Sequence, residues 1–208
     1  ASLQDKLIAR GALGVGWVVL FPQRDRFGGD EAFATSLTQG TNVLAMSDYP
    51  NDQYPEVHGT VILGEDPLYY IPAAGFLTNV EQLSQVTLQG GVSAPTDIDN
   101  LIRQIPLISR APDGWIASFA TQVLKALTGE GTYQIRTNEN GIESIRIPAL
   151  GVIPTDRFGR KWVSWVDTPT TSYQDPQVEG KFVFIGTSGA GIMPQLATPI
   201  GLLNPHYI

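Results

Sequence analysis

Two nearly uninterrupted apolar runs, separated by a short helix-like segment, constrain the fold of this chain more than any other feature. The first run is GVGWVVLF, residues 14–21, and the second is NVLAMS, residues 42–47. Strands without polar alternation are typical of sheets covered on both faces. We expect Asp30 to be the N-cap of the helix between them, and Gly40 follows its end. This β-α-β order predicts two parallel neighbouring strands with helices packed on the sheet.

The remaining pattern predicts an α/β fold, layered, with a mixed, partly parallel central sheet flanked by helices. Residues 2–10 and 113–129 have helical spacing, and in the second segment Asp113 can cap the start. Further strands are expected at 60–64, 73–77, 101–108, 133–137, 143–148, 160–166 and 181–186. Trp17, Trp115, Trp162 and Trp165 all fall in these elements, which predicts that they pack in the core. With 208 residues the chain can form one large domain or two small ones. No boundary is marked, and we expect a single domain over residues 1–208.

Charge and cysteine content exclude several classes of function. The formal net charge is −7, and no basic stripe is present that would bind nucleic acid. The same acidity argues against attachment to an anionic bilayer. There are no cysteines, which excludes disulfides, thiolate nucleophiles and thiolate metal sites. No apolar run reaches the roughly 18 residues that a membrane-spanning helix needs.

A glycine-rich stretch, GTSGAG, follows the last predicted strand and is a typical place for a phosphate loop or a catalytic serine. A phosphate loop needs Lys and Ser/Thr after the final glycine, but Ile192 and Met193 stand there. The stretch is closer to the G-x-S-x-G turn of serine hydrolases, which makes a hydrolase using Ser188 and His206 an alternative. No Asp or Glu follows Ser188, however, and a serine in a turn commonly bonds to nearby backbone.

The acidic residues do not form a metal-binding pattern. The loop with Asp48, Asp52 and Glu56 lacks the spacing of a calcium loop. Asp97 and Asp99 in TDIDN are expected to lie in a solvated turn. The two histidines do not form a zinc pair, so we expect neither a metal nor a cofactor.

The turns at 23–30, 154–160 and 186–191 follow predicted strands and are the best candidates for the rim of a pocket. Ligands of open α/β sheets bind outside the carboxyl ends of the strands, and turn 23–30 follows a buried strand. Turn bonding is the competing explanation for each polar side chain. The candidate ligand contacts are Arg24, Asp30, Asp156, Arg160, Thr187 and Ser188.

Several long segments, in order, resemble the second CHASE family, the extracytoplasmic sensor domains associated with cyclases and with histidine or serine/threonine kinases. The resemblance covers residues 12–208 and rests on GVGWVVLFPQRDRFGGDEAFATSL, DIDNLIRQIPLI, PTDRFGRKWVSW and VEGKFVFIGTSGAGIMPQLATPIGLLNPH. Asn100 stands where the family more often has glycine, and Ser164-Trp165-Val166 replaces its Asn-aromatic-Arg. A buried strand that the family would place before residues 2–10 is missing.

The resemblance implies a non-catalytic input module of a bacterial membrane receptor. Such a domain lies on the periplasmic or extracellular side of the cytoplasmic membrane, anchored by membrane helices outside the present sequence. It implies a cyclase or protein-kinase output, a small-molecule ligand or a periplasmic protein partner, and a homodimer. It also implies that the chain is a piece of a longer receptor.

Overall fold

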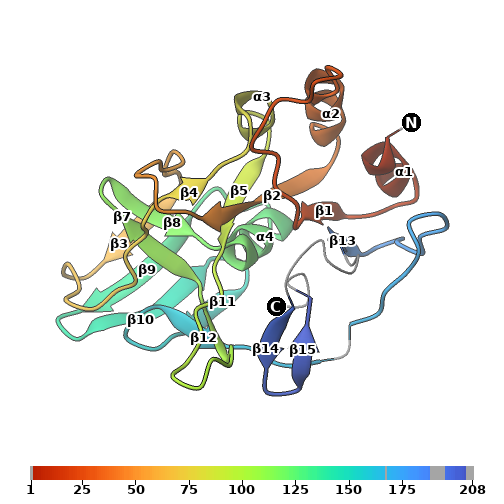
Figure 1. Ribbon diagram of the computed structural model, residues 1–208. Helices are drawn as coiled ribbons and strands as arrows, with labels where there is room; N and C mark the ends of the chain where they lie inside the picture. The colour runs from red at the N-terminus through yellow and green to blue at the C-terminus, as the bar shows by residue number, and fades with distance from the viewer. Residues whose placement is uncertain (1, 167, 188–194, 205–208) are drawn as a thin grey trace.

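A parallel sheet built around β1 and β2 forms the first layer of the structure (Figure 1). The computed structural model describes residues 2–166, 168–187 and 195–204. The strands of this sheet are β13 (Phe182–Ile185), β1 (Gly14–Trp17), β2 (Thr41–Asp48), β5 (Leu88–Val92) and β4 (Phe76–Leu77). The β1–β13, β1–β2 and β2–β5 pairs are parallel, and the short β4 pairs antiparallel with the end of β2. The predicted β-α-β unit is therefore confirmed.

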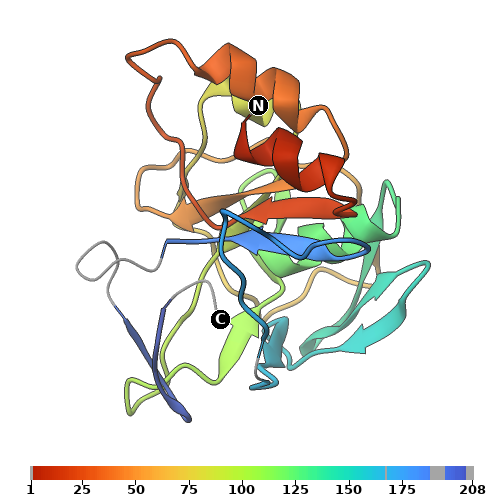
Figure 2. The ribbon, with the colours of Figure 1, turned by 90° about the vertical axis from the view of Figure 1, so that its right-hand side faces the viewer.

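Helices cover both faces of this sheet. They are α1 (Leu3–Ala9), α2 (Asp30–Leu37), α3 (Glu81–Ser84) and α4 (Phe119–Leu127). Figure 2 shows α1 and α2 stacked over β1 and β13. On that face Trp17 and Leu44 pack with side chains of the first three helices, whereas Val43 and Ala45 point to the opposite face and pack on α4. The alternation along β2 explains why the strand is apolar at every position.

A second sheet packs on the other side of α4. Its strands, in spatial order, are β11 (Gly151–Pro154), β10 (Gly141–Ile147), β9 (Tyr133–Asn138) and β3 (Thr60–Leu63). The hairpin of β7 (Ile108–Ala111) and β8 (Gly114–Ala117) packs on it. Trp115, Tyr133 and Ile145 lie in its fully buried core, and Leu124 of α4 packs against them. Helix α4 thus contributes to the cores of both layers.

Two small ribbons complete the described part of the chain. They are β6 (Gln104–Pro106) with β12 (Arg160–Trp162), and β14 (Leu196–Thr198) with β15 (Gly201–Leu203). None of the helices within the described ranges is long and apolar enough to cross a membrane. The predicted class, a layered α/β fold with a mixed, partly parallel sheet flanked by helices, is confirmed.

The prediction of a single helix over residues 113–129 is wrong. Residues 114–117 form β8, and the helix begins only after Ser118, whose hydroxyl accepts a hydrogen bond from the Thr121 backbone N–H at 3.2 Å. Asp113 lies in the tight turn between β7 and β8 and caps no helix. The sequence Ala-Pro-Asp-Gly at 111–114 is a typical turn signal, and it separates the two elements.

Smaller predictions also need correction. Asp30 is the first residue of α2 and Gly29 is its N-cap. The strand predicted at 101–108 forms only over 104–106, and the one at 160–166 only over 160–162. Trp162 is 63% exposed, so it does not pack in the core, unlike Trp17 and Trp115. Strand β12 ends early because its partner β6 has only three residues.

Gly90 allows α4 to approach β5 at backbone contact distance. A Cβ on residue 90 would lie 2.4 Å from the Phe119 Cα and 2.6 Å from its backbone nitrogen. These atoms belong to the first turn of the helix and cannot move away as a flexible side chain could. The identity of residue 90 therefore determines how closely α4 packs on the sheet.

We predict that Gly90→Ala lowers the free energy of unfolding by about 3 kcal/mol, because α4 must shift to make room for the methyl group. Gly131→Ala is the matched control, since a Cβ on residue 131 would meet nothing within 4 Å. The control should change stability by no more than about 0.5 kcal/mol. Urea unfolding followed by circular dichroism measures both, and equal effects of the two substitutions would contradict the close-packing argument.

Candidate functional site

The carboxyl ends of β1 and β13 form a topological switch point. Trp17 pairs with Ile185, and the next backbone N–H, that of Val18, donates to the Ile185 carbonyl at 2.8 Å. From β1 the chain passes through α2 to β2 on one side, whereas β13 occupies the other side of β1. Strand order therefore reverses between β1 and β13. In open α/β sheets, loops that diverge at such a point leave a crevice for ligands.

Three of the predicted site residues lie on chain segments that leave this edge. Arg24 is on the connection from β1 to α2, Asp30 is the first residue of α2, and Thr187 follows the end of β13. Ser188, predicted beside Thr187, lies outside the described residues, as does His206.

Asp156 and Arg160 lie elsewhere: Asp156 is in the turn between β11 and β12, and Arg160 is the first residue of β12. Their side chains form an ion pair at 2.7 Å. The Asp156 carboxylate also accepts hydrogen bonds from the backbone N–H groups of Phe158 and Arg160. Figure 1 shows β12 and α2 at opposite ends of the molecule, so the structure does not bring this pair to Arg24. Within the described chain their visible role is to shape the turn.

The loop before α2 is ordered by its own aspartates. Asp25 accepts hydrogen bonds from the backbone N–H groups of Phe27 and Gly29, and Asp30 accepts one from the Asp25 N–H at 2.9 Å. Arg24 is exposed and has no carboxylate within 4 Å among residues 2–166, 168–187 and 195–204. A guanidinium with its hydrogen-bonding edge in solvent is suited to bind a carboxylate or a phosphate.

The same loop carries a second arginine and an exposed aromatic ring. The Arg26 guanidinium lies 4.8 Å from the centre of the Phe27 ring, and Phe27 is 83% exposed. Stacking on the ring orients the cation while its edge stays accessible. The loop therefore presents two cations and one aromatic face at the edge of the sheet.

Asn79 supports this edge from below, and sequence reasoning missed it. β1 pairs with β2 only as far as Leu44, and β4 starts opposite Ser47, which leaves the Ala45 carbonyl in the gap. The buried Asn79 amide donates to that carbonyl at 2.9 Å. Its side-chain oxygen accepts from the Phe21 backbone N–H at 2.8 Å, which fixes the start of the loop. No local signal marks this asparagine, because the gap exists only once the strands are paired.

An acidic group lies near the same side of the sheet. Asp48 ends β2, and partial desolvation raises the pKa of its carboxyl, while the Ser93 hydroxyl acts in the opposite direction. The described residues contain no group of three or more His, Cys, Asp or Glu side chains that could hold a metal ion.

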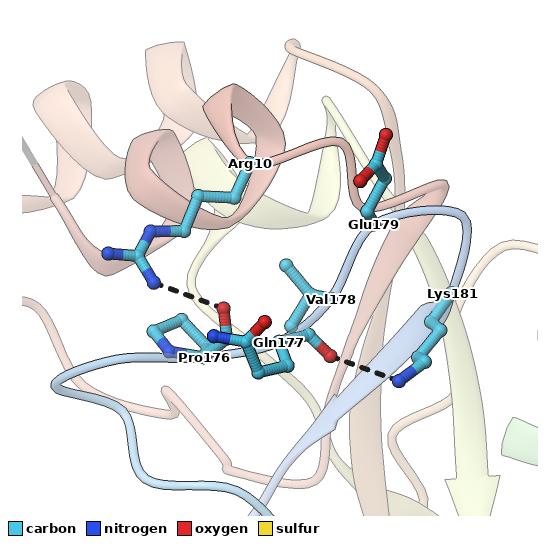
Figure 3. Close-up of a pocket in the computed structure, with 6 residues that line it drawn as sticks. All are labelled: Arg10, Pro176, Gln177, Val178, Glu179 and Lys181. Atoms are coloured by element: carbon cyan, nitrogen blue, oxygen red, sulfur yellow. Dashed lines mark hydrogen bonds between the residues drawn. The ribbon is translucent and has the colours of Figure 1, made fainter.

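A shallow hollow of about 370 Å³ lies at the opposite, amino edge of the sheet (Figure 3). Its walls are the end of α1 and the segment that leads into β13. Arg10 donates to the Pro176 carbonyl at 3.1 Å and forms an ion pair with Asp175 at 2.6 Å, and Lys181 donates to the Gln177 carbonyl at 3.2 Å. Arg10, the C-cap residue of α1, therefore holds this segment against the helix, whereas Lys181 bonds within the segment.

The turn at Asp97 and Asp99 is held by Arg103. Both carboxylates bind its guanidinium, at 2.9 Å and 2.6 Å. Asn100 adopts a positive φ of 61°, which turns the chain back toward the arginine. Asparagine tolerates this conformation better than most residues, and glycine would adopt it without strain.

We predict that Asn79→Ala lowers the free energy of unfolding by about 2 kcal/mol, since the Ala45 carbonyl loses its buried partner. The amides of residues 18–29 should also exchange hydrogen faster, because the Phe21 N–H is released. Gln85→Ala, which removes one exposed hydrogen bond to Glu81, is the control. Hydrogen-exchange mass spectrometry measures the loop, and unchanged protection there would contradict the supporting role of Asn79.

The Arg103 clamp predicts a pH dependence of stability. Hydrogen bonds from the Arg103 guanidinium lower the pKa of Asp99 to about 2. A carboxyl with a depressed folded-state pKa stabilises the fold above its unfolded pKa of about 3.9 and loses this effect as the pH falls toward about 2. Asp99→Asn should therefore be less stable than the parent chain at neutral pH, and the difference should close between about pH 4 and about pH 2.

Urea unfolding at a series of pH values tests this prediction. Asp113→Asn, an exposed aspartate in the β7–β8 turn, is the control, and its small effect should not converge with the parent over that interval. A pH-independent difference for Asp99→Asn would show that Arg103 does not act through the charge of this carboxylate.

Comparison with known proteins agrees with the sequence motifs. The family model of the CHASE2 domain matches residues 1–207, which includes helix α1 as well as the motifs from residue 12 onward. No curated protein and no solved structure matches the chain. Because the match extends over nearly the entire sequence, the chain belongs to the CHASE2 domain family, a family of extracytoplasmic sensory domains of signalling receptors.

Proposed function

We propose that this domain is the input module of a bacterial transmembrane receptor with a cyclase or protein-kinase output, and that it binds a small anionic ligand at the carboxyl edge between β1 and β13. The observation that carries the proposal is the exposed Arg24 on a loop at the switch point of a parallel sheet. In this proposal the domain faces the periplasm or the cell exterior, is anchored by flanking membrane helices and works as a homodimer.

Charge recognition defines the ligand class. Arg24 and Arg26 offer guanidinium groups for a carboxylate or phosphate, and the Phe27 ring offers a face for an apolar or aromatic part of the ligand. Thr187 can add a hydroxyl from the end of β13. The ordered aspartates of the loop keep these groups in place without a large entropic cost on binding.

Strand β13 connects the proposed ligand edge to α1. The carboxyl end of β13 borders the switch point. Just before the start of β13, the Lys181 carbonyl accepts a hydrogen bond at 2.8 Å from the backbone N–H of Leu13, which lies between α1 and β1. If β13 and α1 move together between two states, a ligand that binds one state more tightly shifts the equilibrium toward that state, by an amount set by the difference in affinity. The helix at the start of the chain is then the element through which occupancy is transmitted.

The decisive experiment is a thermal-shift screen of small carboxylates and phosphates, followed by calorimetry on any compound that stabilises the domain. We predict that Arg24→Ala weakens binding of such a compound at least about tenfold, because the charge-assisted hydrogen bonds are lost. Arg146→Ala removes an exposed arginine of the second sheet and is the matched control. Equal affinity of the Arg24 variant and the parent chain would exclude this edge as the binding site.

The serine-hydrolase alternative rests on the Gly186-Thr-Ser188-Gly-Ala190 motif alone. Membership in a sensory family supports the receptor proposal over it. A labelled fluorophosphonate separates the two: covalent labelling of the chain that disappears in Ser188→Ala would establish a nucleophilic serine. Absence of labelling under conditions that label a control hydrolase would eliminate the alternative.

A further inference from the structure

Five large apolar side chains project into solvent from short segments near one end of the molecule. Ile98 is fully exposed, at 105% of its reference area, and the other four are 63–74% exposed. The five residues are Ile98, Trp162, Val166, Ile200 and Leu202. Exposed apolar side chains that occur singly need no explanation, but a group of them marks an interaction site.

The segments that carry these residues are joined to one another. The Ile102 backbone N–H donates to the Ala197 carbonyl of β14, and the Val163 N–H donates to the Arg103 carbonyl, both at 2.9 Å. In Figures 1 and 2 the loop before β6, the β14–β15 hairpin and β12 lie together at the lower end of the molecule. We call Ile98, Trp162, Val166, Ile200 and Leu202 the apolar tips.

The turns that present Ile98 and Ile200 are held by side-chain hydrogen bonds. Asp97 and Asp99 both bind Arg103, which holds Ile98 at the outer point of its loop. In the β14–β15 turn the buried Thr198 hydroxyl donates to the Gly201 carbonyl at 2.7 Å, next to Ile200. Turn positions of this kind usually carry polar residues, because they face water. Here the backbone is fixed and the outermost side chain is apolar.

We propose that the apolar tips insert into the interfacial region of a lipid bilayer and dock this end of the domain on the membrane. The side chains protrude from three separate segments, namely the 97–103 loop, β12 with the residues after it, and the β14–β15 hairpin. This arrangement suits a soft surface better than a flat protein face, and tryptophan favours the membrane interface. The charged residues near the tips balance: two are basic, Arg103 and Lys161, and two are acidic, Asp97 and Asp99. This inference rests on the proposed receptor role, which places a membrane beside the domain.

The tips dock on a bilayer surface of zwitterionic lipid. The net charge of −7 repels an anionic surface, so the attraction comes from the burial of apolar side chains and not from headgroup charge. Docking by a few side chains is weak in solution and becomes effective only when the domain is already held at the bilayer. The test must therefore supply a tether.

The chain carrying a C-terminal histidine tag is bound to phosphatidylcholine vesicles that contain a nickel-chelating lipid and brominated acyl chains. We expect bromine to quench the tryptophan fluorescence, and the double variant Trp162→Phe, Trp165→Phe to lose most of that quenching, since the two remaining tryptophans, Trp17 and Trp115, are buried. The double substitution Ile98→Ser, Ile200→Ser should reduce quenching at least about twofold at the same amount of tethered protein. The control double variant Leu68→Ser, Leu150→Ser changes exposed leucines in the β3–β4 and β10–β11 connections and should leave the quenching unchanged.

Quenching that is absent, or that is equal in the tip double variant and the parent chain, overturns the proposal. A parent chain that is dimeric in light scattering, becomes monomeric in the tip double variant and shows no quenching would also overturn it, because a second copy then covers the tips. Ligand calorimetry on the untethered chain is independent of these outcomes. Failure of membrane docking and failure of ligand binding at Arg24 are therefore distinguishable.

Discussion

The backbone contact between α4 and β5 is the constraint on which the two-layer architecture depends. Gly90 lets the first turn of the helix touch the strand, so that Phe119 and Val123 reach the core of the parallel sheet. On the same helix Leu124 packs in the core of the second sheet. One short helix therefore sets the spacing of both layers, and with it the position of the β6–β12 ribbon and the turns around it. A larger residue at position 90 would displace the whole second layer relative to the first.

Buried amide side chains fix the two edges of the parallel sheet. At the amino edge Gln4 donates to Asn42 at 2.8 Å and accepts from the Trp17 indole at 3.2 Å, while Asn42 donates to the Leu37 carbonyl at the end of α2. At the carboxyl edge Asn79 donates to the Ala45 carbonyl in the gap between β1 and β4, and it accepts from the Phe21 backbone N–H in the loop after β1. These side chains both donate and accept, and in each case the partners belong to different elements. Fully satisfied networks of this kind hold helices in one orientation on a sheet.

The sequence predicted the parts of this structure that depend on local pattern. The β-α-β order and the apolar runs at 14–21 and 42–47 were sufficient to place Arg24 at the carboxyl edge of a parallel sheet. Which strand lies on the far side of β1 depends on contacts distant in sequence, so the switch point with β13 could not be predicted. The apolar segment 114–117 suits a strand or a helix equally well, and only pairing with β7 decides between them. Asp97 and Asp99 are two residues apart, but the positive φ of Asn100, which no local pattern marks, is what turns the chain so that both reach Arg103.

The pairing of Gly14 with Phe182 has a consequence for how the chain folds. Strand β1 comes early in synthesis, but one of its two neighbours is among the last strands to be made. Until then its edge is an open template for other chains, and the loop-closure entropy of a very long connection opposes the final pairing. Topologies with such distant parallel partners fold slowly. The carboxyl edge between β1 and β13 can therefore be completed only after β13 has been synthesised.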